Sequence, residues 1–285
     1  MKIIFFGTPD YVIPIMEALY KKFRTVNKKG VVAVVTQPPK PAGREKRLEY
    51  SAVDVWAYKH KIPIFHNYDD LPGADLGVVA AFGKIIPRAT IEYFPKGILN
   101  VHPSLLPKYR GASPTQAAIS SGDTTTGVTV IKMDEKMDHG PVISKFTEKI
   151  EDTDTNEVLR RRLFERSSDL LVGLIPSYVS GKISLKEQNH EEATFTKLIT
   201  KEDGFISQKA LKEDPEGTER KFRAYQPWPG IYTIVKINAE EKRLKILDLH
   251  LGDEGLVFDQ VQLEGKNPVS WEEFKKGYPT LSFQT

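Results

Sequence analysis

One stretch of the 285-residue chain reads Gly97-Ile98-Leu99-Asn100-Val101-His102-Pro103-Ser104-Leu105-Leu106-Pro107, an apolar segment that ends in a loop bounded by prolines. Such a segment is typical of a buried β-strand. Because side chains alternate along a strand, Asn100 and His102 face one side of the sheet, and Leu99 and Val101 face the other. Ligands of open α/β sheets bind outside the carboxyl ends of the strands. The stretch therefore predicts an amide and an imidazole at a ligand site.

The first part of the chain alternates apolar, β-branched runs with helical patterns. Ser51 is expected to cap one helix, and Asp154 or Thr153 to cap a long one that stops at Gly181. The expected strands are 2–6, 31–35, 76–82, 97–102, 127–133 and 142–146, and the expected helices are 12–23, 51–60 and 155–180. Strands separated by helices predict an α/β fold with a doubly wound, mostly parallel, Rossmann-like sheet.

The sequence pattern changes after Lys182, where a polar connector is followed by short strand-like runs. The expected elements are helices at 207–212 and 219–224 and strands at 231–236, 244–249, 255–258 and 280–283. Short strands with turns between them predict a small C-terminal β-barrel of the OB-like kind. We therefore expect three parts, namely an N-terminal domain 1–184, a linker 185–203 and a C-terminal barrel domain 204–285.

The composition is that of an ordinary globular protein, with 40% hydrophobic and 28% charged residues and a net charge of +3. The absence of cysteine excludes disulfides and thiolate metal ligands, and fits a cytoplasmic protein. No apolar run reaches the length of a membrane span. Charge is uneven, because the segment 21–47 holds nine Lys or Arg against one Glu, whereas the segment from 201 onward holds 13 basic and 15 acidic residues. Such a basic segment attracts phosphate backbones or is simply a solvated surface.

Two common kinds of site lack their sequence signals. Gly7-Thr8-Pro9 joins a strand to a helix, but the G-x-G-x-x-G spacing of dinucleotide-binding proteins is absent. The chain has no H-E-x-x-H motif, and its six histidines are scattered. We therefore expect neither a nicotinamide or flavin site nor a metal site.

The pairing of Asn100 with His102 suggests acyl transfer through a tetrahedral intermediate. An amide N–H donates to an oxygen that gains negative charge, and a histidine donates a second hydrogen bond or carries a proton. A nearby carboxylate would keep that histidine charged and oriented, and the loop 133–141 offers Asp134 or Asp138, between which spacing cannot choose. A Ser104 nucleophile is the alternative, but no G-x-S-x-G elbow surrounds it.

Several motifs resemble those of the folate-dependent formyltransferases. They are Phe6-Gly7-Thr8-Pro9, Asn100-Val101-His102 with the run 104–111, and Met133-Asp134 with Met137-Asp138-His139-Gly140. Three further motifs resemble the branch of this family that acts on methionyl-tRNA, namely Thr36-Gln37-Pro38 leading into Pro41-Ala42-Gly43-Arg44, the connector 193–198, and the run 222–230.

The resemblance implies a reaction and a set of site residues. The donor would be 10-formyltetrahydrofolate, used as a co-substrate with no metal, and the acceptor the amino group of methionine on initiator tRNA. The product would be N-formylmethionyl-tRNA for translation initiation. By motif match, the catalytic residues would be Asn100, His102 and Asp138, the folate residues Ser104, Leu105, Leu106, Pro107, Phe82, Gly83 and Ile85, and the tRNA contacts Lys40, Arg44, Lys46 and Arg47. The C-terminal barrel would lie on the tRNA body, and we expect a monomer with no membrane partner.

Two other functions stay open at this point. One is formyl transfer to an amino-sugar nucleotide, to glycinamide ribonucleotide or to another small amine, and the run His139-Gly140-Pro141 resembles the glycinamide ribonucleotide relatives. The other is a non-catalytic RNA-binding protein of the same fold, against which the intact Asn100, His102 and Asp138 argue.

Overall fold

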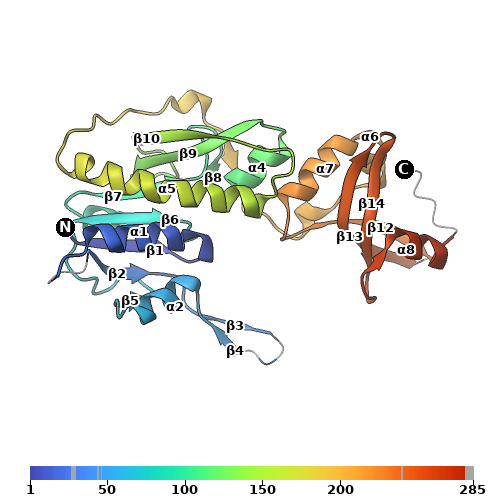
Figure 1. The fold of residues 1–285 in the computed structure, drawn as a ribbon, viewed down its shortest axis with the longest axis horizontal. Helices are drawn as coiled ribbons and strands as arrows, with labels where there is room; N and C mark the ends of the chain where they lie inside the picture. The colour runs from blue at the N-terminus through green and yellow to red at the C-terminus, as the bar shows by residue number, and fades with distance from the viewer. Residues whose placement is uncertain (27–29, 44, 46, 239, 280–285) are drawn as a thin grey trace. The chain divides into compact units, whose positions relative to one another are not determined.

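The structure is a computed structural model that describes residues 1–26, 30–43, 45, 47–238 and 240–279. The chain forms two compact units, and Figure 1 shows their elements. Unit 1 comprises Met1–Pro114, Thr125–Lys149 and Arg160–Thr196, and unit 2 comprises Thr115–Thr124, Ile150–Leu159 and the chain from Lys197 onward. Unit 1 thus includes residues 185–196 of the expected linker. The domain boundaries at 184 and 204 stay a prediction.

Unit 1 is built on a seven-stranded sheet with the order β10-β9-β7-β6-β1-β2-β5. The pairs from β7 through β6, β1 and β2 to β5 are parallel, whereas β9 runs antiparallel to both β7 and β10. The strands are β1 (Ile3–Gly7), β2 (Val31–Val35), β5 (Ile64–Phe65), β6 (Leu76–Ala80), β7 (Ile98–His102), β9 (Thr125–Lys132) and β10 (Val142–Lys149). This sheet confirms the predicted α/β class with a mostly parallel sheet.

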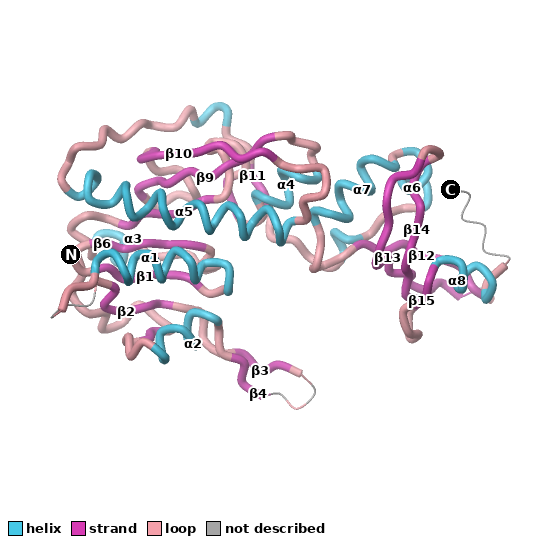
Figure 2. The backbone as a smooth tube through the Cα atoms, in the orientation of Figure 1, coloured by secondary structure: helices cyan, strands magenta, loops and turns pink. Residues whose placement is uncertain are grey.

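The central strands are apolar because both faces of the sheet are covered. Every residue of β1 and β6 is buried, and one hydrophobic cluster joins side chains of β1, β2, β6 and β7 to the aromatic rings of Phe82 and Phe94. Figure 2 shows the helices of unit 1 running beside these strands. These helices are α1 (Ile13–Phe23), α2 (Ala52–Lys59), α3 (Arg88–Glu92) and α5 (Asn156–Val179), with a 3-10 turn at Asp10–Val12 before α1. Residues 156–159 of α5 belong to unit 2, as does α4 (Pro114–Ser120) from Thr115 onward.

The predicted caps have different outcomes. Ser51 caps α2 in a capping box with Asp54, as expected. For α5 the predicted caps Asp154 and Thr153 are wrong, because the backbone N–H of Val158 donates to the hydroxyl of Thr155, at 3.4 Å. The Asp154 carboxylate accepts instead from the N–H of Glu151, at 2.9 Å.

The prolines and glycine of the segment 37–47 predict irregular structure there, and this prediction is wrong. Residues of this segment form an antiparallel hairpin of β3 (Lys40–Ala42) and β4 (Arg47–Glu49). Figures 1 and 2 show this hairpin projecting from the sheet. Both strands of a two-stranded ribbon are edge strands, so the missing N–H of Pro41 is tolerated there. Gly43 has φ +69°, and therefore suits the turn that follows β3.

The sheet order places the ligand edge beside β7. The chain leaves β1 toward β2 and later returns to β6 on the other side of β1, which makes a topological switch point. The carboxyl ends of the parallel strands β1, β6 and β7 share one edge of the sheet. That edge is where ligands of this fold class bind.

Unit 2 contains an antiparallel sheet with the order β12-β13-β14-β15, which is open at both ends among the described strands. The strands are β12 (Ile231–Ile237), β13 (Glu240–Gly252), β14 (Gly255–Leu263) and β15 (Val269–Ser270). The helices α6 (Gln208–Glu213) and α7 (Pro215–Ala224) match the two predicted, whereas α8 (Trp271–Gly277) was not predicted. The strand predicted at 280–283 lies outside the described residues.

Unit 2 also contains a carboxylate whose charge is stabilised by the fold. Asp203 accepts hydrogen bonds from Lys197 Nζ at 2.5 Å, from the N–H of Thr200 at 2.8 Å and from its hydroxyl at 2.9 Å. The bond from Lys197 and the bonds from Thr200 lower the pKa of Asp203 from 3.8 to about 2.

This pKa predicts a pH-dependent stability. Because the folded-state pKa lies below that of the unfolded chain, the ionised Asp203 stabilises the fold above about pH 4, and this contribution is lost as the pH falls toward 2. We expect Asp203→Asn to lower the free energy of unfolding at neutral pH, and the gap to the unsubstituted protein to close by about pH 2. Urea denaturation of both proteins from pH 6 to pH 2 measures this gap, and a gap of constant size would contradict the assignment.

Candidate active site

The structure brings Asn100, His102 and Asp138 together. Strand β7 presents Asn100 and His102 on one face, as the alternation of side chains predicts. Asn100 Nδ2 donates to Asp138 Oδ1 at 3.0 Å, and His102 Nδ1 lies 3.5 Å from Asp138 Oδ2. The side chains of His102 and Asp138 are only 5% and 11% exposed. These three side chains therefore form one largely buried polar cluster.

Asp138 reaches this cluster on a loop that folds back over the sheet. The loop leaves β9 near the amino end of β7, where the N–H of Met133 donates to the carbonyl of Ile98 at 2.8 Å. Its return over the face of β7 lets Asp138 Oδ2 also accept from the N–H of Gly111, at 2.8 Å. Asp134 lies elsewhere, because its carboxylate contacts His139 Nδ1 at 2.6 Å. The carboxylate beside His102 is therefore that of Asp138.

The hydrogen bonds of His102 define what each ring nitrogen can do. His102 Nε2 lies 2.9 Å from the carbonyl oxygen of Tyr109. A carbonyl only accepts, so Nε2 carries a hydrogen and Nδ1 is the nitrogen that faces Asp138. The Nδ1 and Asp138 pair can therefore hold or release one proton while the ring keeps its orientation.

Two buried hydroxyl groups, those of Thr129 and Ser104, hold the backbone of the loop after β7. Thr129 Oγ1 donates to the carbonyl of Ser104 at 2.7 Å and accepts from the N–H of Leu106 at 3.0 Å. The Ser104 hydroxyl donates to the carbonyl of Lys108 at 2.6 Å and not to His102, so its geometry offers no support for a serine nucleophile. Ser104 and Leu106 are buried, whereas Leu105 and Pro107 are partly exposed.

The other predicted folate residues follow the carboxyl end of β6. Phe82 is buried, and its carbonyl accepts from Thr8 Oγ1 at 3.2 Å and from Gln37 Nε2 at 3.0 Å. Gly83 has φ +73°, and Ile85 is 85% exposed. These residues lie one strand away from the Asn100 cluster, at the same edge of the sheet.

Two of the predicted tRNA contacts, Lys40 and Arg47, lie on the β3–β4 hairpin. Lys40 Nζ donates to Gln37 Oε1 at 3.1 Å, and the exposed Arg47 pairs with Glu45 at 2.8 Å. Arg44 and Lys46 lie outside the described residues.

Two residues not singled out from the sequence border the cluster. Arg110 is only 3% exposed, and its guanidinium donates to Gln188 Oε1 and to His190 Nδ1, both at 2.8 Å. Burial lowers the pKa of Arg110, while the carboxylates of Asp138 and Asp134 act in the opposite direction. Burial and the neighbouring His139 and Arg110 lower the pKa of His190, which fits its role as an acceptor. Arg110 lies inside the motif 104–111, whereas nothing in the sequence pattern marks Gln188.

Among the residues that the structure describes, no group of three or more His, Asp or Glu side chains is arranged to hold a metal ion. No described helix is both long and apolar enough to span a membrane.

Residues 1–175 match the family model described as formyl transferase, which spans the sheet and the whole Asn100 cluster. Methionyl-tRNA formyltransferase from Chloroflexus aggregans is 40% identical over 244 residues, covering 82% of this chain and 76% of that protein. The enzyme of the same name from Roseiflexus castenholzii is 36% identical and covers 97% of this chain and 96% of its own. The chain therefore belongs to the formyl transferase family, among the methionyl-tRNA formyltransferases.

Solved structures share the fold at lower identity. A methionyl-tRNA formyltransferase from Clostridium thermocellum has a TM-score of 0.60 and 20% identity, and covers 92% of this chain and 98% of its own. An N-formyltransferase from Helicobacter canadensis, solved with folinic acid and dTDP-3-aminofucose, has a TM-score of 0.67 and 16% identity, covering 95% and 98%. Both confirm the fold, and the family that the motifs indicated is confirmed by the closer relatives.

Proposed function

We propose that this protein transfers the formyl group of 10-formyltetrahydrofolate to the amino group of methionyl initiator tRNA. The observation that carries the proposal is the cluster of Asn100, His102 and Asp138, in which an amide donor and a proton-holding pair meet at the ligand edge of the sheet. Relatives that cover most of the chain carry the name methionyl-tRNA formyltransferase. The product is N-formylmethionyl-tRNA, and the protein acts as a cytoplasmic monomer.

The reaction needs one oxygen to be stabilised and one proton to be moved. The methionyl amine attacks the formyl carbon, and the carbonyl electrons move onto the formyl oxygen. An amide has two N–H bonds, of which Asn100 uses one for Asp138, and the other donates to this oxygen.

The pair of His102 Nδ1 and Asp138 takes the proton from the amine and returns it to N10 of the folate as the C–N10 bond breaks. Both ring nitrogens of His102 face protein oxygens, so the oxyanion is assigned to Asn100 alone rather than to Asn100 with His102. Tetrahydrofolate then leaves.

The folate is assigned to the loops that follow β6 and β7. Leu105, Pro107 and Ile85 offer exposed apolar surface, and Phe82 and Gly83 offer backbone next to it. Ser104 and Leu106 are buried, so we propose that they stabilise the conformation of the loop and that their side chains do not contact the folate. The neighbouring structure from Helicobacter canadensis holds folinic acid, which supports a folate in this fold.

Incubation of the protein with 10-formyltetrahydrofolate and charged initiator tRNA tests the proposal. N-formylmethionine released from the tRNA is the expected product. Parallel reactions with an amino-sugar nucleotide and with glycinamide ribonucleotide test the rival acceptors. Formylation of either rival with no formylation of the tRNA would overturn the proposed acceptor.

The hairpin supplies a separate prediction about tRNA. The Arg47 side chain is 85% exposed, and it pairs at 2.8 Å with the carboxylate of Glu45, whose side chain is 71% exposed. A phosphate can therefore replace that carboxylate. We expect Arg47→Ala to raise KM for tRNA with little change in kcat, because a phosphate contact mainly positions the substrate. The slope of log binding constant against log salt concentration should fall by about 0.7–0.9.

A matched control is Arg161→Ala, which removes an exposed arginine that pairs with Asp10 on the surface of unit 1. The control should leave KM for tRNA and the salt slope unchanged. Equal behaviour of the two variants would mean that the hairpin does not bind tRNA.

A further inference from the structure

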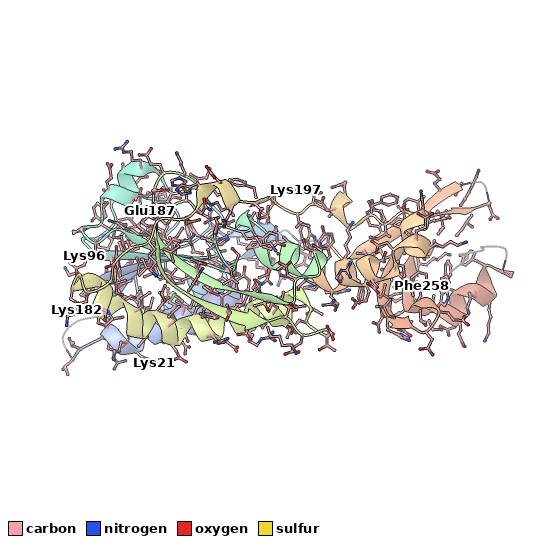
Figure 3. The ribbon with its side chains drawn as sticks, turned by 90° about the horizontal axis from the view of Figure 1, so that it is seen from above. Lys21, Lys96, Lys182, Glu187, Lys197 and Phe258 are labelled. Carbon is pink, nitrogen blue, oxygen red and sulfur yellow. The ribbon has the colours of Figure 1, made fainter. Side chains whose placement is uncertain are left out.

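We propose that Gln188 is a positioning residue for Asp138, supplied by the connector that follows α5. This inference rests on the proposed formyl transfer and adds a group outside the recognised motifs. Gln188 lies 50 residues after Asp138 and is only 7% exposed. Its neighbour Glu187 is labelled in Figure 3, on the connector over unit 1.

The side-chain amide of Gln188 holds the backbone on both sides of His139, directly after Asp138. Gln188 Nε2 donates to the carbonyl of Asp138 and to the carbonyl of Gly140, both at 2.8 Å. An amide NH₂ group has two hydrogens, so these two bonds use both of them. The amide thereby fixes the segment that carries the carboxylate, without contacting the reacting atoms.

Arg110 determines which way the amide points. Its guanidinium donates to Gln188 Oε1 at 2.8 Å. A guanidinium has no acceptor, so the amide oxygen must face Arg110, and the NH₂ group must face the two carbonyls. Arg110 belongs to β8 (Arg110–Gly111), whose next N–H, that of Gly111, holds the Asp138 carboxylate. Strand β8 therefore orients both the Asp138 carboxylate, through Gly111, and the Gln188 amide, through Arg110.

The conformation of Asp138 explains why such a clamp is needed. Asp138 has φ +49°, a left-handed conformation that is costly for a residue with a side chain. A β-carbon at Gly140 would lie 1.9 Å from the carbonyl oxygen of Lys132, so the chain has little room to shift there. The bonds from Gln188 stabilise this backbone in the one arrangement that points the carboxylate at Asn100 and His102.

The connector itself is fastened beside the cluster. Its β11 (Phe195–Thr196) pairs in parallel with β8. The N–H of Tyr109 donates to Thr194 Oγ1 at 2.8 Å, and the N–H of Arg110 donates to the carbonyl of Thr194 at 2.8 Å. The connector therefore fixes the position of Gln188, and Gln188 in turn fixes the backbone of Asp138 through its hydrogen bond to the Asp138 carbonyl.

The test is Gln188→Glu, which keeps the size of the side chain and an acceptor for Arg110 but removes both N–H donors. We expect kcat for formyl transfer to fall about 10- to 100-fold, with each KM within about threefold, because a displacement near 1 Å at the reacting groups costs about that much. Gln188→Met, which removes the donors without adding charge, should lose a similar factor. Because two variants of different chemistry are used, failure of one to fold leaves the other decisive.

A double-mutant cycle separates positioning of Asp138 from a general structural role. If Gln188 acts through Asp138, adding Gln188→Glu to Asp138→Asn should cost no more than about threefold in single-turnover rate. The control Tyr178→Phe removes another hydrogen bond to a backbone carbonyl of unit 1, that of Lys96, at 2.7 Å, and should leave kcat unchanged. Lys96 is labelled in Figure 3.

Two results would overturn the inference, namely an unchanged kcat in both Gln188 variants, or a full additional loss in the double variant. If the unsubstituted protein formylates no methionyl-tRNA, the proposed function fails instead. The two failures are therefore distinguishable.

Discussion

Replacement of Asn100 by alanine is expected to lower kcat about 10²–10³-fold while the protein folds normally, because loss of one oxyanion donor typically has that cost. Among the described residues of the cluster, both ring nitrogens of His102 face protein oxygens. Asn100 uses one of its two N–H bonds for Asp138, so its second N–H bond is available to the formyl oxygen. Its removal leaves the negative charge on the formyl oxygen without a donor in the transition state. Initial rates at saturating donor and tRNA measure the effect.

The matched control is Asn67→Ala, since the exposed Asn67 side chain donates to Asp69 at 2.9 Å on the surface. Its kcat should equal that of the unsubstituted protein. Near-normal turnover in Asn100→Ala, with an unchanged melting temperature, would remove Asn100 from the reaction.

Asp138→Asn is expected to lower kcat by about 10³-fold, within the 10²–10⁴ range of proton-transfer catalysis. The carboxylate accepts from Asn100 Nδ2 through one oxygen and from the N–H of Gly111 through the other. An amide in its place has one oxygen, so its NH₂ group must face one of these two donors. His102 Nδ1 also loses the negative partner with which it holds the proton.

Asp134→Asn is the control for this second prediction. Asp134 belongs to the same loop and also faces an imidazole, that of His139, at 2.6 Å. Because that pair lies outside the Asn100 cluster, kcat should change less than about threefold, as for most surface substitutions. An equal loss in Asp134→Asn and Asp138→Asn would mean that the loop as a whole, and not the Asp138 carboxylate, is required.

The parts of the fold that follow from local patterns could be predicted. The β-branched run Val31–Val35 became β2, Ser51 caps α2, and alternation along β7 placed Asn100 and His102 on one face. The hairpin at Lys40–Glu49 could not be predicted, because prolines normally argue against strands and only the isolated two-stranded geometry tolerates Pro41.

The rest of the site depends on contacts between distant residues. Spacing could not choose between Asp134 and Asp138, because the choice depends on how the loop folds back over β7. Gln188 carries no pattern of its own, and its role arises only when the connector pairs with β8. The sequence motif indicates the family, whereas the positions of these side chains require the tertiary structure.

The most direct test of formyl transfer at this site uses a donor labelled with ¹³C in the formyl group. The labelled 10-formyltetrahydrofolate is mixed with charged initiator tRNA and either the unsubstituted protein or Asn100→Ala, and the amino acid released from the tRNA is examined by mass spectrometry. We predict that the label appears on the methionine nitrogen, at a rate about 10²–10³-fold lower with Asn100→Ala. Recovery of the label as free formate with none on methionine, or equal rates with the two proteins, would contradict the account.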